Sequence, residues 1–151
     1  MIKVKVIISI IIIIIIAGSV IIFTSNEETS EEKWIKSGPF EIDKAQYNMG
    51  EKIFLTTSNL LPEEKGTVQF LRPINDTHHK SYIRIPFDGE DKTHFNYYFE
   101  PRLFAFKGIC SVDDIAGNWI VKFIGTQYED INFEILAQSS SWDERTFEPI
   151  C

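Results

Sequence analysis

The stretch that decides the fold runs from Trp119 to Ile135 and reads WIVKFIGTQYEDINFEI. Apolar side chains occupy every second position on both sides of a short polar segment: Trp119, Val121 and Phe123 before it, and Ile131, Phe133 and Ile135 after it. A period of two residues is typical of a strand with one buried face, whereas an amphipathic helix needs a period of about 3.6 residues. With Gly125-Thr126-Gln127 as the turn, the stretch predicts two consecutive strands.

The same alternation recurs upstream, in residues 40–42, 53–57, 67–71, 81–87 and 93–99. Turn-forming segments separate these runs, among them Tyr47-Asn48-Met49-Gly50-Glu51 and Asp88-Gly89-Glu90-Asp91. Residues 103–109 are apolar without a clear period, and residues 111–116 predict one helical turn with Ser111 as its N-cap. Seven or eight short strands without a long soluble helix predict an all-β protein, an antiparallel β-sandwich over residues 38–136.

The N-terminal part of the chain is a different kind of sequence. Residues 6–23 carry no charge and include seven consecutive isoleucines, Ile10 to Ile16. As a helix this run would extend about 27 Å, close to the thickness of a bilayer core, so it predicts a transmembrane helix and the lipid bilayer as a partner. Lys3 and Lys5 precede the run and four glutamates follow it. The positive-inside rule therefore places residues 1–5 in the cytoplasm and the rest of the chain outside.

A cleaved signal peptide is the alternative interpretation of this run. Residues 1–5 would be its charged region, residues 6–16 its apolar region, and Ala17-Gly18-Ser19 its cleavage site. The apolar residues that resume at 20–23 favour an uncleaved anchor. Both interpretations send the domain to the extracellular or pseudoperiplasmic side, with residues 24–37 as an acidic stalk and residues 137–151 as a polar tail.

The charge of the outer part excludes one class of partner. It holds all 22 acidic residues of the chain but only 13 of the 15 basic ones. A surface with this excess of negative charge repels nucleic acid, so nucleic-acid binding is discarded.

Two covalent features are expected outside a cell. Cys110 and Cys151 are the only cysteines, and an oxidising compartment favours a disulfide between them. An intermolecular bridge and two free thiols remain the alternatives. Asn75-Asp76-Thr77 is an N-glycosylation sequon in a polar loop, which makes Asn75 a candidate acceptor.

Catalytic and metal-binding patterns are not found. His78, His79 and His94 are the only histidines, and their spacing matches no common zinc or copper site. The acidic turns offer oxygen ligands for Ca²⁺ without the spacing of an EF-hand: Asp88, Glu90 and Asp91, Asp113 and Asp114, and Glu129 and Asp130. No nucleophile elbow or phosphate-binding glycine loop occurs. The sequence therefore predicts no enzyme, no catalytic residue and no cofactor.

Aromatic residues crowd around Pro101 and Arg102: Phe95, Tyr97, Tyr98, Phe99, Phe104 and Phe106. Alternation along a strand buries only about half of such a cluster in one sheet face. Tyr98, Arg102 and Phe104 are therefore candidates for a protein interface, because Tyr, Phe and Arg are favoured there. A thick aromatic core is the alternative interpretation.

Two motifs carry a resemblance to a known family. Tyr47-x-x-Gly50-Glu51 resembles the turn that opens an early strand in macroglobulin-type and archaeal surface sandwiches. Asp114-x-x-Gly117-x-Trp119 resembles the corner that leads into the penultimate strand of such folds. The resemblance covers residues 40–136 and implies an immunoglobulin-like ectodomain at a cell surface, with no catalytic residues. The anchor and the acidic, aromatic ectodomain together are similar to uncharacterised single-pass membrane proteins of ammonia-oxidising archaea.

The functional prediction follows from the anchor and the sandwich together. We expect a membrane-anchored extracellular interaction module, a non-catalytic accessory or structural component of a membrane or cell-envelope complex. The partner would be another envelope or membrane protein. An extracytoplasmic domain that binds a small ligand or Ca²⁺ is the alternative.

Overall fold

The computed structural model describes residues 34–139 and 147–151. The predicted anchor, its alternative cleavage site and residues 24–33 of the stalk lie outside the described residues, and so does Trp142. No helix in the described part is long and apolar enough to span a bilayer.

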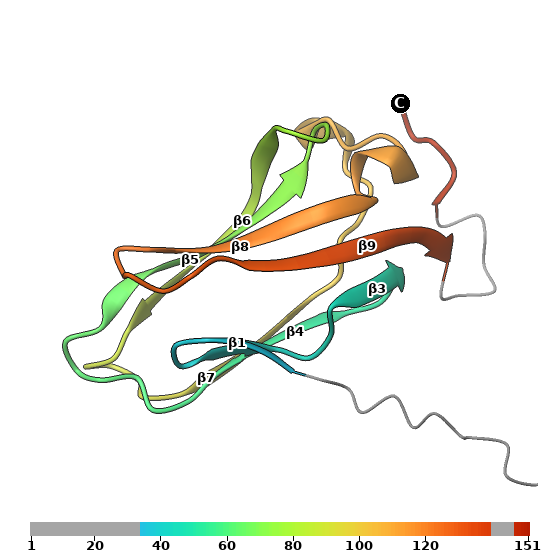
Figure 1. Ribbon diagram of the computed structural model, residues 1–151. Coiled ribbons are helices and arrows are strands. Elements are labelled where there is room, and N and C mark those ends of the chain that lie inside the picture. The colour runs from blue at the N-terminus through green and yellow to red at the C-terminus, as the bar shows by residue number, and fades with distance from the viewer. Residues whose placement is uncertain (1–33, 140–146) are drawn as a thin grey trace, which may run out of the picture. The chain divides into compact units, whose positions relative to one another are not determined.

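The described chain forms nine strands in two sheets, which confirms the all-β prediction (Figure 1). The smaller sheet has the order β1-β2-β4-β7. The larger sheet has the order β3-β9-β8-β5-β6. In chain order the strands are β1 Ile35–Ser37, β2 Phe40–Ile42, β3 Gln46–Met49, β4 Ile53–Thr57, β5 Lys65–Pro73, β6 His79–Asp88, β7 Phe95–Phe99, β8 Gly117–Ile124 and β9 Ile131–Ser139.

Aromatic side chains join the two sheets into a sandwich. Phe40 of β2 stacks on Phe123 of β8 with ring centroids 4.6 Å apart, and Phe70 of β5 meets Phe99 of β7 edge-on at 4.6 Å. Both Phe40 and Phe70 are fully buried. Contacts of this kind contribute beyond the area that they bury, so they favour this pairing of the sheets.

The opening stretch folds as predicted. β8 and β9 pair antiparallel, with Trp119 opposite Phe133 and Val121 opposite Ile131. All six apolar residues at alternate positions are buried: Trp119, Val121, Phe123, Ile131, Phe133 and Ile135. Alternation of burial along both strands places their shared inner face on the core.

The prediction of a turn at residues 47–51 was wrong for its first three residues. They belong to β3, and Tyr47 and Met49 are each 1% exposed. β3 lies beside β9 and pairs with it in parallel, so the sandwich is not antiparallel throughout (Figure 1). The burial of alternate side chains decided the conformation, since two large apolar residues gain more in the core than in an exposed turn.

Several strands are longer than the sequence pattern predicted. β1 lies within the segment assigned to the stalk, where its residues pair with β2. β5 and β6 extend into segments expected to be loops and pair with each other over most of their length. Backbone pairing can extend into polar sequence because it needs no particular side chain.

The segment between β7 and β8 contains two short 3₁₀ helices. η1, Ala105–Lys107, lies in a tight loop closed by a bridge between Phe104 and Ile109. η2, Val112–Asp114, confirms the predicted helical turn, because Ser111 and Asp114 form a capping box at its start.

Candidate interaction surface

The outer face of the smaller sheet carries an aromatic strip, defined here as Trp34, Phe54 and Tyr98. Phe54 of β4 and Tyr98 of β7 stack with ring centroids 4.4 Å apart, and Trp34 meets Phe54 edge-on at 5.6 Å. The strip forms because Ile53 and Leu55 point into the core, which turns the even-numbered positions of β4 outward. Tyr98 remains 61% exposed and Trp34 37% exposed. Large aromatic rings are therefore presented to solvent on one face.

A hollow of about 550 Å³ adjoins the strip at Tyr98 and is lined by Lys52, Phe99, Glu100 and Arg102 as well. The Arg102 guanidinium donates to Glu100 at 3.0 Å, and the Arg102 side chain is 73% exposed. The carboxylate of Glu100 raises the pKa of Arg102 further above its ordinary value. A permanent cation thus lines the same hollow as the exposed ring of Tyr98.

Phe104 lies in a separate cluster, the η1 patch, defined as Phe104, Phe106 and Lys107. The rings of Phe104 and Phe106 are 5.9 Å apart, and Phe106 is 96% exposed. Lys107 lies over the rings of Tyr82 and Phe104. In the described part of the chain no ring contact joins Phe104 to Tyr98, so the predicted trio is divided between two surfaces.

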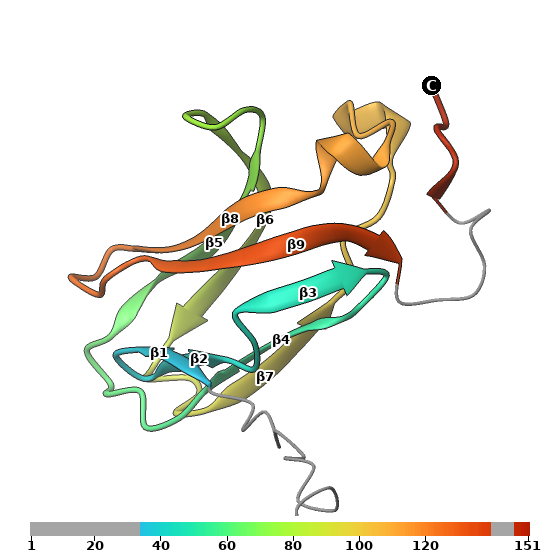
Figure 2. The same ribbon diagram turned by 45° about the vertical axis from the view of Figure 1, so that its right-hand side comes forward.

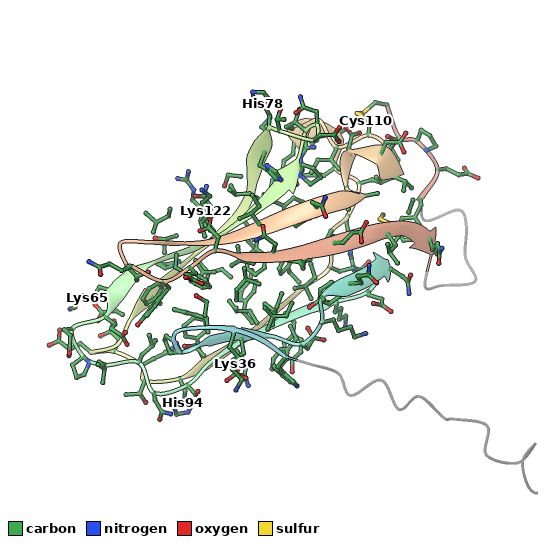
Figure 3. The ribbon with its side chains drawn as sticks, viewed as in Figure 1. Lys36, Lys65, His78, His94, Cys110 and Lys122 are labelled. Atoms are coloured by element: carbon green, nitrogen blue, oxygen red, sulfur yellow. A yellow bond between two sulfur atoms is a disulfide. The ribbon has the colours of Figure 1, made fainter. Side chains whose placement is uncertain are left out.

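Cys110 and Cys151 form a disulfide, with Cα atoms 5.2 Å apart. Cys110 lies at one end of the sandwich, after the η1 loop (Figure 3). The Ile150 amide donates to the Cys110 carbonyl at 2.9 Å, and Phe147 packs against the core as expected for a docked tail. The pairing is the predicted intramolecular disulfide, and it ties the C-terminus to this end of the sandwich.

Arg72 stabilises the same end of the sandwich from the interior. It is only 4% exposed, and its guanidinium donates to the carbonyls of Asp114 at 2.9 Å, Pro73 at 3.2 Å and Gly108 at 3.3 Å. A buried cation is tolerated only when its donors are satisfied. Arg72 thus connects the two loop segments on either side of Cys110 to the end of β5.

Asp114 completes this network with its carboxylate. It accepts hydrogen bonds from the amides of Cys110 at 2.8 Å and Ser111 at 3.0 Å. These bonds, with the Cys110 amide the largest contribution, lower the pKa of Asp114 below its ordinary value, and the nearby charge of Arg72 acts in the same direction. The carboxylate is engaged in capping a turn.

The other predicted polar residues are spread over the sandwich. His78 and His94 lie at opposite ends of it (Figure 3). Within residues 34–139 and 147–151, no three His, Cys, Asp or Glu side chains are close enough to hold a metal ion. Asp88 and Glu90 both pair with Lys65. Asn75 is exposed, and its side-chain oxygen accepts from the amides of Thr77 and His78 in a local turn.

Trp34 and Phe54 were missed by the sequence interpretation, as was the outward position of Phe106. The period-two pattern of β4 does contain the signal for Phe54, since it separates Ile53 from Leu55.

Comparison of the chain with protein-family models, curated proteins and solved structures finds no match.

Proposed function

We propose that the protein is a membrane-anchored extracytoplasmic interaction module, a non-catalytic accessory or structural component of a membrane or cell-envelope complex. The observation that carries this proposal is the aromatic strip, in which Tyr98 is 61% exposed and shares a hollow with the cation of Arg102. Exposed aromatic rings next to arginine are the residue types that dominate protein interfaces. The partner surface is expected to be apolar with an acidic rim, to complement Arg102 and Lys52.

The sheet topology supports membership of the immunoglobulin-like folds. The order β9-β8-β5-β6 corresponds to the G-F-C-C′ order of such sandwiches, and β2-β4-β7 corresponds to A-B-E. Trp119 at the start of β8 donates its indole N–H to the Ile115 carbonyl at 2.7 Å. This bond resembles the aromatic corner of immunoglobulin-like domains, in which a ring near the start of strand F bonds to upstream backbone. We therefore propose the macroglobulin-type sandwich that the two sequence motifs resemble.

The location rests on the sequence and on the disulfide. Residues 6–23 are apolar enough to span a bilayer, and disulfides persist in oxidising compartments outside the cytosol. The proposed setting is a single-pass protein with its ectodomain outside, similar to membrane proteins of ammonia-oxidising archaea. Three of the acidic residues considered as Ca²⁺ ligands have partners within the domain: Asp88 and Glu90 pair with Lys65, and Asp114 caps a turn.

The proposal is tested by purifying the tagged full chain in mild detergent from membranes of its native cells and identifying bound proteins by quantitative mass spectrometry. Tyr98→Ser removes the exposed ring and leaves the strand backbone unchanged. Phe106→Ser is the matched control, because it removes an even more exposed ring from the η1 patch. We expect Tyr98→Ser to deplete a partner that wild type and Phe106→Ser retain. A chain that emerges alone in all three cases contradicts the proposal, and thermal stabilisation by Ca²⁺ would favour the ligand-binding alternative.

A further inference from the structure

β7 is an edge strand that lacks the features by which the other edge strands of the sandwich discourage pairing with another chain. The sheet orders leave β1 and β7 at the edges of the smaller sheet and β3 and β6 at the edges of the larger one. β1 has three residues including Lys36, β3 has a register shift against β9, and β6 carries Arg84 and Pro86. Short length, irregularity, charge and proline all discourage pairing with another chain. β7 reads Phe95-Asn96-Tyr97-Tyr98-Phe99 and has none of these features.

The backbone groups that face away from β4 belong to Asn96 and Tyr98. The Phe54 carbonyl accepts from the Asp43 amide on the β2 side of β4, at 3.3 Å. Backbone direction alternates along a strand, so Leu55 faces β7, where it lies opposite Tyr97. Tyr97 therefore points its backbone N–H and C=O groups toward β4. Its neighbours Asn96 and Tyr98 point theirs away from β4, at the open edge. β4 is the only strand that β7 pairs with in the described part of the chain (Figure 2).

Open space borders this edge on both sides. One hollow of about 550 Å³ lies between β6 and β7 and is lined partly by Phe95, Asn96 and Tyr97. The hollow beside Tyr98 and Arg102, of the same volume, borders the other end of β7. An extended strand therefore has room to approach the outward groups of Asn96 and Tyr98.

We infer that β7 pairs antiparallel with β7 of a second copy of this chain, with the two-fold axis at Tyr97. Asn96 of each copy then lies opposite Tyr98 of the other. Each such pair exchanges two backbone hydrogen bonds, so the two pairs form four. The two four-stranded sheets become one continuous sheet. This register is the one in which both outward-facing residues of each copy meet outward-facing residues of the other.

The residues that flank β7 favour a second copy over an unrelated strand. In this register His94 of one copy lies opposite Glu100 of the other, and Phe95 opposite Phe99. Lys52, Lys92 and Arg102 line the two hollows together with Asp88, Asp91 and Glu100. Basic and acidic side chains thus balance along this edge, and no net charge there repels a second copy. Aromatic residues directly opposite each other stabilise a strand pair, so the match of Phe95 with Phe99 favours this register. The inference goes beyond the proposed function, because it uses the backbone of β7 rather than the side chains of the aromatic strip.

Two variants at Asn96 test the pairing by sedimentation equilibrium of the full chain in density-matched detergent. Asn96→Pro removes an outward N–H that β4 does not use, whereas Asn96→Ala loses the same side chain and keeps the N–H. We expect wild type and Asn96→Ala to dimerise and Asn96→Pro to raise the dimer dissociation constant by roughly tenfold or more. A monomeric wild type, or equal dimerisation of both variants, overturns the inference. Equal dimerisation would place the contact elsewhere, for example in residues 6–23.

A cross-link provides a test that does not depend on the folding of Asn96→Pro. Residues directly opposite in a non-hydrogen-bonded antiparallel pair have Cα atoms about 4.5 Å apart, within reach of a disulfide. Tyr97→Cys is therefore expected to give a disulfide-linked dimer on mild oxidation, visible by non-reducing electrophoresis. Arg84→Cys on the edge of β6 is the control: it should still dimerise through β7 but form no disulfide-linked dimer. Equal cross-linking of the two variants, or none for Tyr97→Cys, contradicts a dimer centred on Tyr97.

Discussion

Tyr47 has a buried ring and a hydroxyl that both donates and accepts a hydrogen bond. The hydroxyl donates to the Asp43 carboxylate at 2.6 Å and accepts from the Lys44 amide at 3.2 Å, while Asp43 also accepts from the Phe54 amide at 3.1 Å. Burial, followed by the hydrogen bond to Asp43, raises the pKa of the Tyr47 phenol. The side chain thus links β3 to the start of β4 through one carboxylate.

Tyr47→Phe tests this link. The substitution keeps the ring and leaves the Asp43 carboxylate and the Lys44 amide without that partner, so we expect the free energy of unfolding to fall by about 1–2 kcal/mol. Urea unfolding followed by tryptophan fluorescence measures the change. Tyr97→Phe is the control, since the Tyr97 hydroxyl has no hydrogen-bond partner in the described chain, and it should change stability little. Equal losses for both variants would contradict the role of the hydroxyl.

Asp114 gives the stability a dependence on pH with a definite sign. Its pKa is lowered in the folded chain, so the carboxylate contributes stability that is complete above the unfolded pKa of about 3.9 and is lost as pH falls through the lower folded value. Asp114→Asn replaces a charged acceptor of two amide hydrogen bonds by a neutral one, so it should cost about 1 kcal/mol at pH 7. The difference from wild type should shrink below about pH 4. Urea unfolding of both proteins across this range measures it, and a difference that grows on acidification would contradict the assignment.

The residues that form this end of the sandwich were predictable to different degrees. Asp114, Gly117 and Trp119 follow a motif whose physical roles are local, so the sequence indicates the corner correctly. Arg72 gives no such signal. A charged residue in a period-two segment is normally interpreted as a solvent-facing position. Two of the three carbonyls that satisfy Arg72, those of Gly108 and Asp114, reach it only after distant segments have packed.

At the scale of elements, β8 depends on a glycine at its first residue. Gly117 has φ of 118°, and an added Cβ would lie 3.3 Å from the Pro73 side chain at the end of β5. Only glycine adopts this backbone conformation without strain, and the contact with Pro73 is tighter than side chains ordinarily make.

Gly117→Ala is therefore expected to lower the free energy of unfolding by about 1–3 kcal/mol from backbone strain, with a further loss from the contact with Pro73. Gly108→Ala is the matched control. Gly108 also has positive φ, at 65°, but an added Cβ there has no neighbour within 4 Å, so only the smaller left-handed penalty of about 1–2 kcal/mol applies. Thermal unfolding of the two variants compares them. A Gly108 variant less stable than the Gly117 variant would contradict the account.

For β3, the period-two pattern of the sequence indicates neither the strand conformation nor its pairing partner. The sequence from Tyr47 to Met49 has two apolar residues and a following glycine, which suits a turn as well as a short strand. Its strand conformation depends on β9, nearly ninety residues later, and no local feature indicates that the pairing is parallel. The prediction for the aromatic cluster of residues 95–106 was incomplete for the same reason. Alternation predicted that some rings face outward, but it did not indicate which sheet or loop carries them.

At the scale of the whole molecule, the disulfide closes a loop with a sequence separation of 41 residues. Such a cross-link restricts the unfolded chain, and the chain-entropy model gives a contribution of about 4 kcal/mol. We expect the Cys110→Ser, Cys151→Ser double variant to lose up to this amount in chemical denaturation, and reduced wild type to lose a similar amount. Alkylation without reductant, followed by intact-mass measurement, should label no thiol in the native protein. Two labelled thiols would contradict the pairing.

The same cross-link changes how the protein responds to mechanical tension. A force on the C-terminus enters the fold at Cys110, because Cys151 is bonded there. β8 and β9, which hold the centre of the larger sheet, lie inside the covalent loop and cannot be drawn out by a pull between the ends of the chain. With a separation of 41 residues, roughly 140 Å of extension is withheld until the bridge is reduced. Under tension between the two ends of the chain, the cysteine pair therefore limits the extension and keeps the force off β8 and β9.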